Sequence, residues 1–223
     1  MPWKARKAIR TYEKIETIFA RDMEGTKKLI PGKYRNETIE FLRDVPWVWT
    51  EKVDGTNVRI LWDGHYISYG GRTERASLPV PLVNKLNEYF GGEQAAQLFE
   101  QMFGDREVIL FGEGYGDKIQ AVGKDYIPGG VDFIVFDVLI GNYYQPRDNV
   151  VGIAKAFGLR AVPVVGIGTL EQAMEYVKGE PMSVVAQQPV AMEGVVCRPA
   201  LELHDRCGNR LIVKIKRNDF VEL

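Results

Sequence analysis

Residues 51 to 59 read EKVDGTNVR, and Lys52 lies two positions before an Asp-Gly pair. A lysine amine becomes a nucleophile only after it loses its proton, so its pKa must fall from about 10.4 through burial or nearby cations. Gly55 would let the turn bring its backbone close to a ligand, and Asp54 with Asn57 would hold that turn. Lys52 is therefore a candidate nucleophile, although a single lysine on a strand is more often a solvated charge.

A second pair of lysines lies near the C-terminus, in the segment LIVKIK. On a strand Lys214 and Lys216 share one face, while Val213 and Ile215 share the other. Two parallel ammonium groups suit a phosphate, and they could stabilise charge as a phosphorus centre is attacked and pyrophosphate leaves. Ordinary surface strands show the same alternation, so the pair alone is a weak signal.

Two glutamates lie among apolar residues. Glu113 follows an apolar strand in VILFGEGYG, and Glu193 has apolar neighbours on both sides in VAMEGVV. A carboxylate in such surroundings is rarely buried without a partner. A salt bridge is one explanation, and the other is that one glutamate binds a sugar hydroxyl and the other a divalent cation.

The residues around Lys52 predict an antiparallel hairpin with the lysine at its entry. VPWVWTEK is rich in β-forming residues, and NVRILW and HYISYG alternate on either side of Asp63-Gly64. An Asp-Gly pair between two such segments is a strong hairpin signal. Further strands are predicted at REVILFGEGYG, DFIVFDVLI, RAVPVVGIG, EGVVCRP and RLIVKIK.

Helical periodicity separates these strands. Apolar residues at helical spacing predict two helices that part near Gly91-Gly92 and a third over residues 147 to 158. Thr169 with Gln172 forms a capping-box pattern for a helix to about Lys178. Residues 8 to 44 suggest a strand and a helix or two. Helices inserted among hairpins without strict alternation indicate an α+β fold with mainly antiparallel sheets.

Composition excludes several classes of protein. The 223 residues are 45% hydrophobic with a net charge of −1, which indicates a globular protein and excludes a globally basic nucleic-acid binder. Cys197 and Cys207 are too few for a disulfide framework and suit a reducing cytosol. A zinc site at His204 and Cys207 is disfavoured because the chain has only two His and two Cys.

Several motifs are absent from the sequence. No apolar run is long enough for a membrane span, and the N-terminus lacks the apolar stretch of a signal peptide, so we expect a cytoplasmic protein. GEGYG lacks the spacing of a dinucleotide-binding loop, and no phosphate-loop, G-x-S-x-G or H-E-x-x-H motif occurs.

The motifs that do occur stand in a definite order: K-x-D-G, an Arg, F-G-E, an F-D strand, E-G-V-V and K-x-K. In this order the chain resembles the covalent nucleotidyltransferase superfamily, which includes ATP-dependent DNA ligases, RNA ligases and mRNA capping enzymes, over residues 45 to 218. TEKVDGTN, followed twenty residues after the lysine by Arg72-Thr73, looks most like the RNA ligases of the T4 phage ligase-2 type. DNA ligases more often have a Glu two residues before the lysine, where this chain has Thr50.

The resemblance implies an ATP-grasp-like adenylation domain of the α+β class, with two mainly antiparallel sheets flanked by helices and the nucleotide in the cleft between them. It implies that Lys52 attacks the α-phosphate of ATP to form a lysyl-adenylate. Lys214 and Lys216 would contact that phosphate, and one of them would help to expel pyrophosphate. The AMP would then pass to a 5′-phosphate, which is joined to a 3′-OH.

Other roles also follow from the resemblance, and they divide among the base, the ribose, the phosphates and the metal ion. The residues are Glu51 for the base edge, Asp54 and Gly55 in the lysine turn, Asn57 for the polynucleotide steps, Arg72 for ribose or phosphate, Glu113 for the ribose hydroxyls, Phe136 for stacking on adenine, and Glu193 for a metal ion or a lysine. Mg²⁺ or Mn²⁺ would offset the phosphate charge and orient the leaving group.

We expect residues 1–223 to form a single nucleotidyltransferase domain, with 1–44 an N-terminal extension packed on it. We expect no C-terminal OB or helical domain of the kind with which relatives grip a polynucleotide. A minimal ligase, a trimmed one, or one whose protein partner supplies RNA grip would each fit. The expected substrate is RNA with 5′-phosphate and 3′-OH ends, in a nick or at free ends. RNA repair is the expected use, and a monomer is the expected state.

Two alternatives stay open. Within the enzyme class, the chain could be a DNA ligase core or a capping-type enzyme that uses GTP, because K-x-D-G does not define the nucleotide. From another class, it could be a catalytically inactive module that binds a nucleotide or an RNA end. Use of NAD⁺ is disfavoured, since NAD⁺-dependent ligases need an additional N-terminal domain.

Overall fold

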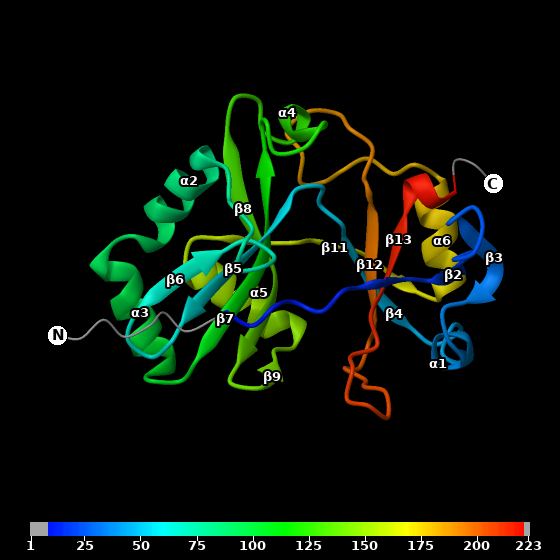
Figure 1. The fold of residues 1–223 in the computed structure, drawn as a ribbon, viewed down its shortest axis with the longest axis horizontal. Helices are drawn as coiled ribbons and strands as arrows, with labels where there is room; N and C mark the ends of the chain where they lie inside the picture. The colour runs from blue at the N-terminus through cyan, green and yellow to red at the C-terminus, as the bar shows by residue number, and fades with distance from the viewer. Residues whose placement is uncertain (1–8, 221–223) are drawn as a thin grey trace. The chain divides into compact units, whose positions relative to one another are not determined.

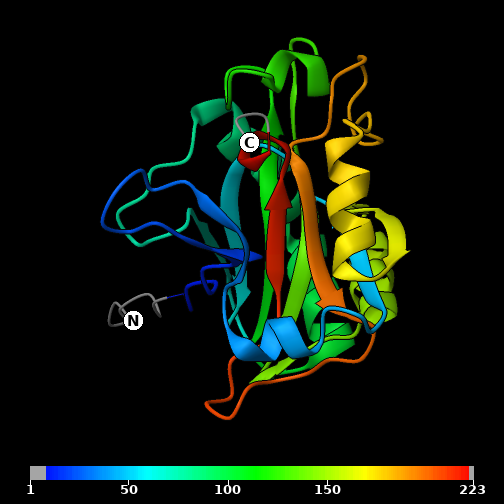
Figure 2. The ribbon, with the colours of Figure 1, turned by 90° about the vertical axis from the view of Figure 1, so that its right-hand side faces the viewer.

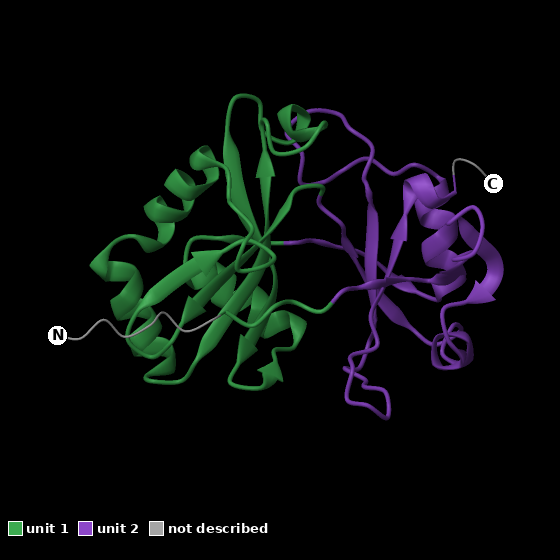
Figure 3. Cartoon of the chain, viewed as in Figure 1, with its two compact units in different colours: residues 1–13, 54–161 green, residues 14–53, 162–223 purple. Residues whose placement is uncertain are grey.

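Two compact units make up the chain in the computed structural model, which describes residues 9–220. Unit 1 contains the chain up to Glu13 and residues Asp54–Ala161, and unit 2 contains Lys14–Val53 and the chain from Val162 onward (Figure 3). Each unit is therefore built from separate stretches of sequence. The chain passes from one unit to the other after Glu13, after Val53 and after Ala161.

A six-stranded sheet forms the centre of unit 1, in the order β10-β8-β7-β5-β6 with β9 beside β8 (Figure 1). Its strands are β5 (Thr56–Trp62), β6 (Ile67–Gly70), β7 (Val108–Gly116), β8 (Val131–Ile140), β9 (Tyr143–Tyr144) and β10 (Arg160–Ala161). Only the pairing of β10 with β8 is parallel among these described strands. The predicted α+β class with mainly antiparallel sheets is confirmed here.

Three helices of unit 1 bury an apolar face in one core with this sheet, namely α2 (Val80–Phe90), α3 (Glu93–Phe103) and α5 (Arg147–Ala156). The short helix α4 (Gly123–Tyr126) contacts β7 and contributes no residue to that core. Leu86 of α2 and Phe99 of α3 are fully buried in one core with Phe133 of β8. Each large apolar side chain buried in this way contributes about 1.5–3 kcal/mol. The predicted separation of α2 from α3 at Gly91-Gly92 is confirmed.

The predicted hairpin after Lys52 is formed by β5 and β6. Its connection is longer than the Asp-Gly pair, because β6 begins at Ile67 rather than at His65. The Asp63 carboxylate accepts hydrogen bonds from the N–H groups of His65 and Tyr66, at 2.9 and 2.7 Å, and so holds both residues in the turn. Gly64 has a φ of 95°, which its lack of a Cβ permits.

Unit 2 contains a five-stranded sheet in the order β1-β13-β12-β4-β11. Its strands are β1 (Glu16–Thr17), β4 (Trp47–Glu51), β11 (Val164–Gly168), β12 (Gly194–Pro199) and β13 (Val213–Lys216). The pairing of β1 with β13 is parallel, and the other three pairings are antiparallel. The sheet thus joins strands from the first 51 residues to strands from the last third of the chain.

A helix packs against this sheet, as Figure 2 shows for α6 (Leu170–Lys178, yellow) beside β12 (orange) and β13 (red). The predicted capping box is confirmed, since the Thr169 hydroxyl accepts from the Gln172 N–H and the Gln172 side chain accepts from the Thr169 N–H. The remaining elements are β2 (Phe19–Arg21), β3 (Leu29–Tyr34), α1 (Glu37–Phe41) and the 3-10 turn η1 (Arg217–Asp219). No helix among residues 9–220 is both long and apolar enough to cross a membrane.

The prediction of one strand over RAVPVVGIG is wrong. The segment divides into β10, which joins the sheet of unit 1, and β11, which joins the sheet of unit 2. Pro163 lies at the division, and a proline has no N–H to donate to a sheet. This proline lies close to the point where the chain leaves unit 1 for unit 2.

Candidate active site

The main chain of unit 2 fixes Lys52 beside two strands from the far end of the sequence. Lys52 directly follows β4, and its N–H donates to the carbonyl of Gly194 at 2.9 Å. Gly194 begins β12 and lies opposite Lys216 of β13. The antiparallel register therefore brings the lysine of K-x-D-G to the K-x-K strand.

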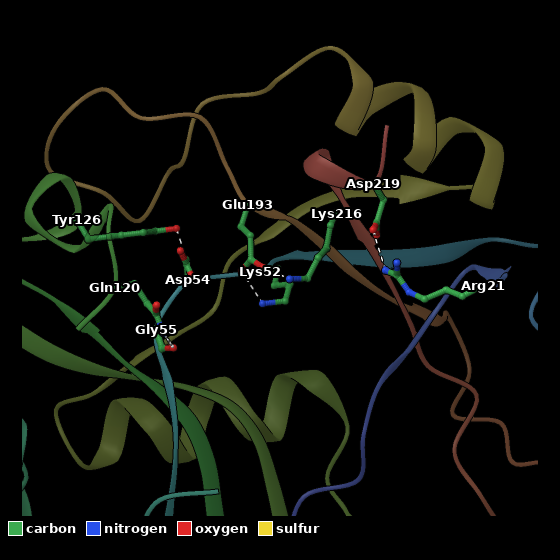
Figure 4. A network of polar contacts seen from close by, with 9 residues as sticks. All are labelled: Arg21, Lys52, Asp54, Gly55, Gln120, Tyr126, Glu193, Lys216 and Asp219. Atoms are coloured by element: carbon green, nitrogen blue, oxygen red, sulfur yellow. Dashed lines mark hydrogen bonds and ion pairs between the residues drawn. The ribbon is translucent and has the colours of Figure 1, made fainter. Parts of the chain in front are cut away.

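Glu193 joins two of these lysines through its carboxylate (Figure 4). Lys52 Nζ lies 2.5 Å from Oε2, and Lys216 Nζ lies 2.6 Å from Oε1. The Glu193 side chain is 16% exposed, which strengthens its interaction with both ammonium groups relative to a pair in water. The structure thus brings together Lys52, Glu193 and Lys216, as the motif order suggested.

Lys214 belongs to the same cluster. It lies two residues before Lys216 on β13, while Val213 and Ile215 are buried on the opposite face, so the predicted alternation is confirmed. Burial lowers the pKa of Lys214 most, and the charges of Lys216 and Lys52 lower it further. Lys214 therefore adds a third ammonium group near the two that contact Glu193, and such a group of cations favours a bound polyanion.

The donor set decides what kind of metal ion would fit. Among residues 9–220, no group of three or more His, Cys, Asp or Glu side chains could hold a metal ion. Within the same range, Glu193 is the carboxylate that contacts both Lys52 and Lys216. Mg²⁺ commonly takes one or two carboxylates and completes its shell with substrate phosphates and water. The residues present fit a metal ion that is bound together with a nucleotide.

Glu51, the residue before Lys52, is almost completely buried, at 1% exposure. Its Oε2 accepts a hydrogen bond from the Val184 N–H at 3.0 Å, and its Oε1 accepts one from the Ser183 hydroxyl. These contacts fasten the segment after α6 to the end of β4. The role of Glu51 at the edge of a base stays a prediction.

In unit 1, two side chains hold the turn that follows Lys52 (Figure 4). Gln120 Nε2 donates to the carbonyl of Gly55 at 2.9 Å, and the Asp54 N–H donates to the Tyr126 hydroxyl at 3.3 Å. Both partners come from the segment around α4. No spacing in the sequence indicated them, because loop residues carry no periodic signal.

Gly55 is required for close packing within unit 1. A Cβ at this position would lie 2.2 Å from the Gly114 carbonyl oxygen and 2.9 Å from Cγ of Glu113. Both distances are shorter than a Cβ tolerates, so the glycine lets the turn approach β7. The structure thereby places the turn against Glu113, the residue predicted to hold the ribose.

Asn57 lies opposite Glu113 in the pairing of β5 with β7. Its side-chain oxygen is buried and accepts no hydrogen bond from the described residues. A buried acceptor without a partner costs about 1–3 kcal/mol. A ligand or a water molecule that donates to this oxygen would recover that cost.

Phe136 and Arg72 lie elsewhere in unit 1. The ring of Phe136 meets the ring of Tyr12 edge-on at 5.0 Å, and the Tyr12 hydroxyl donates to Asp137 Oδ2 at 2.7 Å. Arg72 lies in the exposed segment after β6, where the carbonyl of Gly71 accepts from Arg59 Nε at 2.6 Å. Contacts of Phe136 with adenine and of Arg72 with ribose or phosphate stay predictions.

The RNA ligase family model matches residues 45–216, from just before β4 to the last lysine of the cluster. The match covers most of the chain, so this protein belongs to the RNA ligase family. The resemblance to these ligases is confirmed. No curated protein sequence matches the chain significantly.

Solved structures share the fold. The Naegleria gruberi RNA ligase with pyrophosphate is 19% identical, with a TM-score of 0.65, over 96% of this chain and 57% of that one. A mutant of the same ligase with ATP and Mn is 18% identical, with a TM-score of 0.65, over 96% of this chain and 58% of that one. The nucleotidyltransferase fold is thus confirmed, and this chain spans less than two thirds of the length of the ligases that it matches.

Proposed function

We propose that this protein is an ATP-dependent RNA ligase that works through a covalent lysyl-AMP intermediate on Lys52. The observation that carries the proposal is the cluster in which Glu193 bonds both Lys52 and Lys216. The family to which the chain belongs supports it, as do the ATP, AMP and pyrophosphate bound to Naegleria gruberi ligases of the same fold.

The first step would join the amine to the nucleotide. Lys52 Nζ would give its proton to the Glu193 carboxylate with which it is hydrogen-bonded and attack the α-phosphorus. An N–P bond forms, the bond from that phosphorus to the β-phosphate oxygen breaks, and pyrophosphate leaves with the electron pair. Lys214 and Lys216 would stabilise the charge that develops on the phosphate oxygens.

The surrounding residues would hold the reactants in place. Glu193 would share a divalent ion with the nucleotide phosphates, where Mg²⁺ or Mn²⁺ would offset their charge. Glu113 would bind the ribose, Phe136 would stack on adenine, Glu51 would contact the base edge, and Arg72 would bind ribose or phosphate. Asp54, Gly55 and Asn57 would shape the turn, with Asn57 serving the polynucleotide steps.

Two further transfers would complete ligation. A 5′-phosphate oxygen of RNA attacks the phosphorus of the lysyl-AMP, the N–P bond breaks, and the nitrogen takes up a proton so that Lys52 leaves as the amine. A 3′-OH then loses its proton and attacks the 5′-phosphorus, and AMP leaves. The proposed substrate is RNA with a 5′-phosphate and a 3′-OH, and we propose a single domain over residues 1–223 acting as a cytoplasmic monomer in RNA repair, with a partner where more RNA grip is needed.

Incubation with Mg²⁺ and α-labelled ATP, followed by denaturing electrophoresis, tests the first step. The wild-type protein should carry the label, and Lys52→Ala should not, while Lys155→Ala on the surface of α5 should label normally. A labelled Lys52→Ala variant would show that another residue is the nucleophile. Labelling by GTP instead of ATP would favour a capping-type enzyme.

Joining is tested separately, with 5′-phosphorylated RNA and DNA strands. Sealing of RNA strands supports the RNA ligase, and preferential sealing of nicked DNA would favour a DNA ligase core. An adenylated protein that joins neither would overturn ligation. Folded protein that is not adenylated as purified and accepts neither nucleotide would favour the inactive binding module.

A further inference from the structure

A second basic site lies in unit 2, where the β2–β3 hairpin meets η1. A cavity of about 200 Å³ opens there. It is lined by Arg21, Thr26, Lys27, Lys28, Leu29, Asn218 and Asp219. Three of these side chains are cations and one is an anion, so the lining carries a formal excess of positive charge. Phosphate groups are the common biological ligands of such Arg and Lys clusters.

Arg21 is oriented by contacts at both ends of its guanidinium. Its Nη2 donates to Asp219 Oδ1 at 2.8 Å (Figure 4), and its Nη1 donates to the carbonyl of Lys27 at 3.1 Å. Arginine has five N–H donors, and these described contacts use two of them. The side chain remains 37% exposed, so its other donors can meet a ligand.

The hairpin loop presents its lysines from a fixed backbone. The Asp22 carboxylate accepts from the N–H groups of Gly25 and Thr26, each at 2.9 Å. The Lys27 N–H donates to the carbonyl of Asp22 at 2.9 Å, and Lys27 has a φ of 58°. A lysine in this left-handed conformation is strained, and such strain concentrates at functional sites. These hydrogen bonds therefore hold the loop backbone in a defined conformation.

The cavity lies close to the reacting lysines along the chain. η1 begins at the residue after Lys216, and Asp219 lies three residues beyond that lysine. Three residues span at most about 11 Å of extended chain. In the proposed function Lys52, Lys214 and Lys216 serve the phosphates of ATP. A second phosphate-bearing substrate would need other cations, and Arg21 and Lys27 of the cavity supply them.

We propose that this cavity binds a backbone phosphate of the polynucleotide strand whose end reacts at Lys52. Arg21 supplies oriented N–H donors, Lys27 and Lys28 supply charge, and Asp219 acts as a positioning residue for Arg21. The inference rests on the proposed function, because it takes the second substrate to be a polynucleotide. It assigns part of the RNA grip to the unit that carries the nucleophile.

Binding of a short, fluorescent, 5′-phosphorylated RNA strand, measured by anisotropy over a range of salt concentrations, tests the proposal. In the Lys27→Asn variant, asparagine accepts the left-handed backbone while the cation is removed. The slope of log K against log salt should fall in magnitude by about 0.7, the value for one single-strand phosphate that the protein no longer neutralises. Lys33→Ala is the matched control, because Lys33 is exposed on β3 and does not line the cavity.

Arg21→Lys is the second variant, since it keeps the charge and removes the oriented fork. It should weaken RNA binding more than Lys33→Ala does, while thermal melting shows that unit 2 stays folded. Self-adenylation by ATP should be unchanged in both cavity variants. An unchanged salt slope together with slowed adenylation would assign the cavity to ATP or pyrophosphate and overturn the proposal.

Variants that behave like Lys33→Ala in every assay would also overturn it. The binding assay needs no catalysis, so its outcome is separate from that of the proposed function. Failure of the wild-type protein to label with ATP would contradict the lysyl-AMP mechanism, whereas weaker salt-dependent RNA binding in Lys27→Asn would still locate a phosphate site.

Discussion

At the scale of single residues, Glu193 is the centre of the cluster because its two oxygens bond two different lysines. A carboxylate between two ammonium groups offsets their mutual repulsion and fixes where each amine lies. Removing it would leave Lys52, Lys214 and Lys216 close together without that counter-charge. The site therefore depends on Glu193 for its geometry as well as for any proton transfer.

We predict that Glu193→Gln slows formation of the lysyl-AMP by about 10²–10⁴-fold, the usual contribution of a positioned acid or base. The amide keeps the shape of the side chain and loses its charge and basicity. Single-turnover labelling with ATP measures the effect. Glu175→Gln is the control, since Glu175 is an exposed residue of α6, and equal rates in the two variants would contradict the role of Glu193.

We predict that Lys214→Met raises the stability of the folded protein at neutral pH. Burial and the charges of Lys216 and Lys52 lower the pKa of Lys214 in the folded state below its usual 10.5. Between the pKa of the folded state and 10.5, the folded state therefore binds fewer protons than the unfolded state. The free energy of unfolding of the wild-type protein should therefore rise relative to that of the variant as the pH rises toward 10.5. Urea unfolding of both proteins across this range measures the gap, and a gap independent of pH would contradict the explanation.

At the scale of elements, the segment around α4 supports the turn that follows Lys52. Tyr126 is buried at 1% exposure and Gln120 is exposed, yet each bonds the main chain of the turn. The two contacts constrain Asp54 and Gly55 directly. Under the proposed function, the segment would act on the reaction through the backbone of this turn.

We predict that Tyr126→Phe lowers the free energy of unfolding by about 0.5–1.5 kcal/mol, the net value of one hydrogen bond. It should also slow adenylation, because the Asp54 N–H loses an acceptor that orders the turn. Thermal melting and labelling kinetics measure the two effects. Tyr66→Phe is the control at an exposed turn position, and a Tyr126→Phe variant that matches it in both assays would contradict this role.

Local elements were predictable because their signals are local. The helices α2 and α3, the capping box of α6 and the alternation of β13 all follow from spacing within a few residues. For residues 8 to 44 the sequence suggested a strand and a helix or two, and the structure has β1, β2, β3 and α1 there. The strand β1 could not be predicted, because it has two residues and exists only through its pairing with β13. The division at Pro163 also escaped, since each half of that segment belongs to a different sheet.

For the candidate site, too, the sequence indicated motifs and their order but not contacts between distant residues. The order of the motifs indicated Lys52, Glu193, Lys214 and Lys216, and the register of the unit 2 sheet brings them together. Spacing could not indicate Ser183, Gln120 or Tyr126, because each acts from a loop or a short helix on a residue far away in the sequence.

At the scale of the whole molecule, both cysteines lie in unit 2 and differ in accessibility. Cys207 is exposed, whereas Cys197 is fully buried in β12, and burial raises the pKa of the Cys197 thiol. A thiol reagent needs both access and the thiolate. Reaction at Cys197 therefore reports the opening of the unit 2 sheet.

We predict that the native protein reacts with a thiol reagent in two phases of equal size, one fast and one slow. Cys207→Ser should remove the fast phase, and the slow phase should follow the rate of unfolding measured by circular dichroism. Cys197→Ser should remove only the slow phase. Rapid reaction of both thiols in folded protein would contradict the burial of β12.

Unit 2 combines an early and a late stretch of the sequence, and this determines when the proposed active site can first form during synthesis of the chain. Lys52 is synthesised long before β12 and β13, the strands beside which it lies in the folded unit. At ordinary translation rates the nascent chain waits on the order of ten seconds between these events. Under the proposed function, a chain that terminates before Glu193 would carry Lys52 without Glu193 or Lys216 and should be unable to load itself with AMP.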